Sequence, residues 1–98
     1  PIQVRLIPVS NEIHASHAYK VKQLLMDAGI RCDVDAREEK LGYRMREAQL
    51  KKVPMTVVIG DNELTNNTVT YRKHGTQEQI TVSLDEFIKL INDSYPQI

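Results

Sequence analysis

The chain has 98 residues, of which 41% are hydrophobic and 27% charged, and its 13 basic and 13 acidic side chains give a formal net charge of zero. This length is typical of one compact domain, and no stretch approaches the roughly 20 apolar residues that a membrane-spanning helix needs. Zero net charge argues against a protein that coats nucleic acid without specificity. The single cysteine, Cys32, excludes an intrachain disulfide and fits a reducing compartment such as the cytoplasm.

The first half of the chain alternates apolar strand patterns with amphipathic helical patterns. In chain order, the predicted strand, helix, strand, helix and strand span residues 3–9, 14–28, 30–35, 41–52 and 55–60. Gly29 follows the first helix and Pro54 the second, as expected at helix ends. This order, with nearly continuous apolar strands, is typical of a parallel sheet that is covered on both faces. Right-handed crossovers then favour the strand order 2-1-3, with the two helices on opposite faces.

The second half of the chain predicts an antiparallel extension of this sheet. A polar turn at Asp61 and Asn62 follows the third strand. Residues 68–73 then predict an antiparallel strand, and residues 81–82 a short edge strand. Residues 83–86, Ser-Leu-Asp-Glu, form a capping box that begins the last helix.

Together these elements predict a single α/β domain over residues 1–98. It has three layers, in which a mostly parallel mixed sheet of about five strands, in the order 2-1-3-4-5, carries helices on both faces. Ligands of such sheets bind beyond the carboxyl ends of the parallel strands, where residues 10–11, 36–39 and 60–63 form a polar rim. The chain contains no glycine-rich phosphate-binding motif, which argues against a phosphate cradle of the usual kind.

This polar rim suits the edge of an unpaired RNA base. A carboxylate such as Glu63 can accept hydrogen bonds from N1–H and N2–H of guanine, and an arginine such as Arg72 can donate to two acceptors of one base. Lys40, Arg44 and Lys51 share a narrow sector of the second helix, where they could hold phosphates. The same three residues also fit an ordinary solvated helix face, and Glu63 and Arg72 fit an exposed ion pair.

Residues 35–50 make the interpretation more specific. Their sequence is Asp-Ala-Arg-Glu-Glu-Lys-Leu-Gly-Tyr-Arg-Met-Arg-Glu-Ala-Gln-Leu, and residues 28–31, 53–55 and 58–63 extend the pattern on either side. This pattern resembles the C-terminal anticodon-binding domain of threonyl-tRNA synthetase, over essentially the whole chain. Related domains occur in the prolyl, histidyl and glycyl enzymes. The resemblance implies a non-catalytic module, without a cofactor of its own, that binds the anticodon loop of tRNA(Thr).

The resemblance also implies which residues contact the anticodon. In the family, base contacts come from an Asn in an Arg-Asn-Glu-Lys run, from a Glu shortly after Gly-Asp, and from an Arg on the following strand. Glu63 and Arg72 match the second and third of these. Arg37 matches the start of the first run, but Glu38 stands where the family has Asn. A carboxylate only accepts hydrogen bonds, which leaves Glu38 a role through water or none.

The implied parent chain is a cytoplasmic threonine–tRNA ligase, a homodimer whose catalytic domain lies N-terminal to this segment. That catalytic domain is expected to use ATP, Mg and a Zn ion. The implied partners are the tRNA and the catalytic domain of the same chain, and neither DNA nor a membrane is expected. A free-standing paralogue that serves as a protein-interaction or regulatory subunit is an alternative. A small thiol-dependent enzyme that uses Cys32 is a third hypothesis.

The histidines and the cysteine also raise the question of a metal site. His14 and His17 have the spacing H-x-x-H, and with Cys32 or His74 they could form a zinc site. Both histidines, however, lie on the apolar side of the first helix, where packed or half-buried side chains are expected. Cys32 lies inside a predicted strand, which favours an inert buried thiol. The sequence therefore predicts no metal site in this domain.

Overall fold

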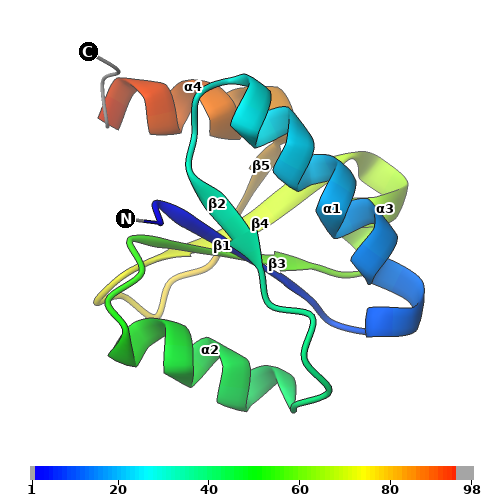
Figure 1. Cartoon of the computed structure of the whole chain (residues 1–98). Coiled ribbons are helices and arrows are strands. Elements are labelled where there is room, and N and C mark those ends of the chain that lie inside the picture. Colours follow the sequence, from blue (N-terminus) through cyan, green and yellow to red (C-terminus); the bar gives the residue numbers. More distant parts are fainter. Residues whose placement is uncertain (1, 95–98) are drawn as a thin grey trace.

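Five strands form one mixed sheet between two layers of helices (Figure 1). The computed structural model describes residues 2–94. The strands span Val4–Pro8 (β1), Cys32–Val34 (β2), Met55–Ile59 (β3), Thr68–Lys73 (β4) and Ile80–Ser83 (β5). Their order is β2-β1-β3-β4-β5, as the sequence predicted. β1 pairs in parallel with β2 and β3, whereas β4 pairs antiparallel with β3 and β5, so the carboxyl ends of β1, β2 and β3 meet at one edge.

The helices span Asn11–Asp27 (α1), Leu41–Leu50 (α2), Asp61–Asn66 (α3) and Leu84–Ser94 (α4). α1 and α4 cover one face of the sheet and α2 covers the other, as right-handed crossovers require (Figure 1). Both α1 and α2 match the predicted helices to within three residues at each end. Within the described range 2–94, no helix combines the length and the apolar character that crossing a membrane requires.

The main hydrophobic core lies between the sheet and the layer of α1 and α4. Leu6 of β1, Val57 of β3 and Leu25 of α1 are fully buried in it. Phe87 of α4 is also fully buried, and its ring centroid lies 5.4 Å from that of Tyr71 on β4. Because side chains alternate along a strand, the residues between these core positions face the opposite layer, on the side of α2.

Helix α3 occupies the segment where the sequence predicts a turn at Asp61 and Asn62. The backbone N–H of Gly60 donates to Oε1 of Glu63 at 2.7 Å, and acidic side chains in the first turn favour a helix N-terminus. Asn67 follows α3 with a φ of 56°, a conformation that asparagine tolerates. The prediction of a turn was therefore wrong, since the same polar residues also suit a short helix that long-range contacts hold in place.

Cys32 lies in β2, is 7% exposed, and is predicted to be unreactive. Burial raises the pKa of its thiol above the ordinary value. The neutral thiol therefore persists at neutral pH, and this protection is lost only as the pH rises through the raised pKa. We expect a thiol reagent at neutral pH to label Cys32 in the native chain at least about tenfold more slowly than in the chain unfolded by guanidinium. Equal rates would instead support a reactive thiol.

Candidate functional site

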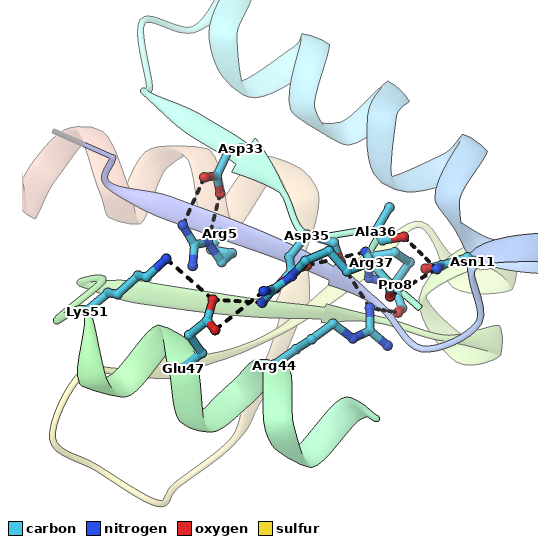
Figure 2. Close-up of polar contacts among 10 residues, drawn as sticks. All are labelled: Arg5, Pro8, Asn11, Asp33, Asp35, Ala36, Arg37, Arg44, Glu47 and Lys51. Carbon is cyan, nitrogen blue, oxygen red and sulfur yellow. Dashed lines mark hydrogen bonds and ion pairs between the residues drawn. The ribbon is translucent and has the colours of Figure 1, made fainter. Parts of the chain in front are cut away.

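The loop of residues 35–40 lies at the carboxyl edge of the sheet, between β2 and α2. Asn11, the first residue of α1, holds this loop: its Nδ2 donates to the carbonyl oxygens of Ala36 at 2.6 Å and Arg37 at 3.1 Å (Figure 2). The side chains of Glu38 and Lys40 on this loop are exposed. The loop therefore presents both candidates to solvent at the edge where α/β sheets bind ligands.

Arg44 does not belong to an exposed basic face. It is only 2% exposed, and its Nη1 donates to the carbonyl oxygens of Pro8 at 2.8 Å and Asp35 at 3.0 Å (Figure 2). Its Nη2 donates to the carbonyl oxygen of Val9 at 3.4 Å. The expectation of a solvated Arg44 was wrong, because backbone carbonyls at the ends of β1 and β2 need donors and this guanidinium supplies them.

Arg37 is held between two carboxylates (Figure 2). Its Nε and Nη2 donate to Asp35 at 2.8 and 2.9 Å, and its Nη2 and Nη1 donate to Glu47 at 2.7 and 3.4 Å. These hydrogen bonds lower the pKa of Asp35 and of Glu47 and raise the pKa of Arg37. Lys51 also approaches Glu47, at 3.4 Å. Asp35, Arg37 and Glu47 are therefore charged at neutral pH.

Lys40 and Lys51 lie at opposite ends of α2. Both side chains are exposed. At 1.5 Å per residue the two positions are about 16 Å apart along the helix axis. They cannot contact one phosphate together, and only Lys40 lies beside the carboxyl edge of the sheet.

Glu63 is less exposed than the sequence predicted. The residue is 8% exposed, and both of its carboxylate oxygens have partners in the chain. Oε1 accepts from the backbone N–H of Gly60 at 2.7 Å, and Oε2 accepts from the hydroxyl of Thr70 at 3.0 Å. Oγ1 of Thr70 also lies 2.8 Å from Oγ1 of Thr81 on β5. In the described residues Glu63 is thus bonded to Gly60 and Thr70 and forms no exposed ion pair with Arg72.

The hydrogen bond to Thr70 nevertheless brings Glu63 close to Arg72. Thr70 and Arg72 are two residues apart on β4, so their side chains project from the same face of the sheet. Two residues of a strand span about 7 Å. Arg72 and Thr70, the partner of Glu63, therefore lie two residues apart on the side of the sheet that α2 covers.

Arg72 lines a pocket of about 610 Å³ between α2, the sheet and the loop of residues 74–79. Such a volume is within the range of small-molecule sites. The other side chains in it include Met45, Arg46, Gln49, Val58, Gln77 and Gln79. Among residues 2–94, the buried atoms Nε of Arg72 and Nε2 of Gln49 have no hydrogen-bond partner. The pocket thus combines the apolar side chains of Met45 and Val58 with polar side chains, among them Arg72 and Gln49.

Several of these pocket residues were not predicted from the sequence. Arg46 and Gln49 follow Gly42 at spacings of four and seven, which places them on one side of α2, and this spacing was the available signal. Gln77 and Gln79 belong to a loop that folds back over the sheet, and nothing in the local sequence indicates that position.

The histidines do not come together as a metal site. His14 is 4% exposed, accepts at Nδ1 from the backbone N–H of Ser10 at 3.0 Å, and donates from Nε2 to Asp61 at 2.7 Å. His17 is half-buried, and burial lowers its pKa. Both are packed side chains, as predicted. Within residues 2–94, no group of three or more His, Cys, Asp or Glu side chains is placed to hold a metal ion.

Comparison with known proteins gives one family. Residues 3–94 match the family model described as "Anticodon binding domain". The chain is 51% identical over 88 residues to the threonine–tRNA ligase of Geobacillus sp. (strain WCH70), and this match covers 90% of the chain. It is 48% identical over 89 residues, or 91% of the chain, to threonine–tRNA ligase 1 of Bacillus subtilis (strain 168). In both cases the chain spans only 14% of the relative's length.

Solved structures show the same fold. The RNA-binding domain of threonyl-tRNA synthetase from Cryptosporidium parvum Iowa II is similar with a TM-score of 0.88 and 26% identity, over 95% of this chain and 23% of that one. Prolyl-tRNA synthetase from Cryptosporidium parvum is similar with a TM-score of 0.84 and 20% identity, over 96% of this chain and 20% of that one, which supports the fold alone. The resemblance read from residues 35–50 is thus confirmed.

Proposed function

The chain belongs to the anticodon-binding domain family, and we propose from this membership that it recognises the anticodon loop of tRNA(Thr) as the non-catalytic part of a threonine–tRNA ligase. The observation that carries the proposal is the pocket that Arg72 lines between α2 and the sheet, on the same face of β4 as Thr70, which holds Glu63 by a hydrogen bond. Unpaired RNA bases are read by their edges in pockets that combine stacking surfaces with hydrogen-bonding side chains.

We assign the base contacts by chemistry. The guanidinium of Arg72 donates to acceptors of a base seated in its pocket. Each oxygen of Glu63 keeps a second lone pair beside its bond to Gly60 or Thr70, and these lone pairs accept from N1–H and N2–H of guanine. Glu38 contacts the loop through water. Lys40 and Lys51, which are exposed at the two ends of α2, contact different phosphates of the backbone.

The remaining properties of the parent protein are also proposals, because the chain spans 14% of the ligases that it matches. We expect the parent to be a cytoplasmic homodimer that ligates threonine to its tRNA. ATP, Mg and Zn would be used by its catalytic domain, and none of the residues described above is assigned to them. That catalytic domain would be the second partner of this segment.

A titration of the 98-residue chain with a threonine anticodon stem-loop tests the proposal. We expect amide resonances of residues 36–39, of residues 60–63 and of Arg72 to shift, with an affinity that falls as salt is added. A stem-loop whose second and third anticodon bases are exchanged is the matched control, and it should bind more weakly at every salt concentration. An absence of shifts in these segments at low and high salt alike would refute the proposal.

A further inference from the structure

The two carboxylates around Arg37 leave it little capacity to read a base by its edge. A guanidinium has five N–H donors, all in its plane. Four of them donate to Asp35 and Glu47. Bidentate recognition of a base needs two free donors along one edge of the guanidinium, and Arg37 no longer offers two such donors. What remains is the flat face of the guanidinium, and the side chain is 46% exposed.

An aromatic ring lies next to this guanidinium. Tyr43, in the first turn of α2, is 50% exposed, and the Cζ atom of Arg37 lies 5.8 Å from the centroid of its ring. This distance is within the range of a cation–π contact. Aromatic rings and arginine planes are the two surfaces on which proteins stack unpaired RNA bases.

The arrangement is also held in place before any ligand arrives. Asp35, which is only 7% exposed, and Glu47 restrain the rotamer of Arg37, and Tyr43 projects from a helix. A side chain that is already ordered loses little conformational entropy on binding, which favours affinity. Both residues lie beside the exposed side chains of Glu38 and Lys40, at the carboxyl edge of the sheet.

We propose that Tyr43 and Arg37 form a stacking platform for one unpaired base of the anticodon loop, separate from the bases read at Arg72 and Glu63. The proposal rests on the proposed function, and it gives Arg37 a stacking role in place of edge recognition. Every base has a π-face, so the platform accepts any base and contributes affinity without selecting a sequence.

A cycle of protein and RNA changes tests the platform. We expect Tyr43→Ala to weaken binding of the threonine anticodon stem-loop by about tenfold, and Tyr43→Phe to leave it nearly unchanged, because stacking needs the ring and not the hydroxyl. A series of stem-loops that are abasic at one loop position each should identify one nucleotide whose removal weakens the wild-type chain but not Tyr43→Ala.

The controls separate this proposal from the proposed function. Tyr19→Ala removes an equally exposed ring, 51% against 50%, from α1 on the other face of the sheet, and it should not change binding. Tyr43→Leu, which keeps an apolar side chain but no π-face, replaces Tyr43→Ala if that variant does not fold. If the wild-type chain fails to prefer the threonine loop, the proposed function is wrong. The stacking platform is wrong if the wild-type chain prefers that loop but the Ala or Leu variant of Tyr43 binds it equally well. It is also wrong if every abasic stem-loop weakens binding of that variant as much as it weakens binding of the wild-type chain.

Discussion

Replacing Arg44 by methionine is expected to lower the free energy of unfolding by about 2–4 kcal/mol. Methionine retains the length of the side chain but cannot donate to the carbonyl oxygens of Pro8, Val9 and Asp35. Each buried carbonyl that loses its donor costs roughly 1–3 kcal/mol, and part of this loss is recovered by water or by local movement. Urea unfolding measures the effect as a lower midpoint with an unchanged slope.

Arg46→Met is the matched control for this experiment. Arg46 lies two residues further along α2, with an exposed side chain, so its replacement should change the free energy of unfolding by less than about 0.5 kcal/mol. Equal effects of the two substitutions would contradict the structural role of Arg44. The salt dependence of RNA binding gives a second readout. Lys40→Met should reduce the slope of the logarithm of the binding constant against the logarithm of the salt concentration by about one, whereas the Arg44→Met variant, measured where it is folded, should leave this slope unchanged.

Replacing Arg72 by methionine is expected to weaken binding of the threonine anticodon stem-loop by about 1–3 kcal/mol, that is, roughly 5- to 150-fold. The guanidinium is the cationic side chain on the sheet side of the pocket, and its Nε has no partner among the described residues. Its loss removes donors that a base would use, so discrimination at one anticodon position should fall. Titrations with stem-loops that carry each of the four bases at that position measure both effects.

Lys73→Met is the control for charge alone. Lys73 is the next residue of β4 and is exposed, and because strand side chains alternate, it projects from the opposite face. Its replacement should weaken binding of all stem-loops by a similar small factor, which added salt would diminish. In the full-length ligase, Arg72→Met should raise the KM for tRNA. A base preference that stays unchanged in Arg72→Met would show that Arg72 does not read the anticodon.

The sequence alone predicted much of the fold, because its signals are local. Hydrophobic periodicity identified five strands and the helices α1, α2 and α4, and the handedness of crossovers then determined the strand order. It did not identify α3, since its six residues are too few for a periodic pattern and also suit a turn. The motif around residues 35–50 identified the family, and through it Glu63 and Arg72.

Tertiary structure alone decided how the charged side chains of this site are used. Arg44 and Arg37 look alike in the sequence, as basic residues in or near an exposed helix. Arg44 is buried against the carbonyl oxygen of Pro8 in β1, 36 residues earlier in the chain, whereas Arg37 is held by Asp35 of its own loop and by Glu47 of α2. A helical pattern gives each residue an angle relative to the apolar stripe, but not the partners that the neighbouring strand ends supply. The carbonyl partner of Arg44 comes from a distant strand, and Glu47 reaches Arg37 from α2, so only the packing of α2 against the sheet determines which cations remain free to bind RNA.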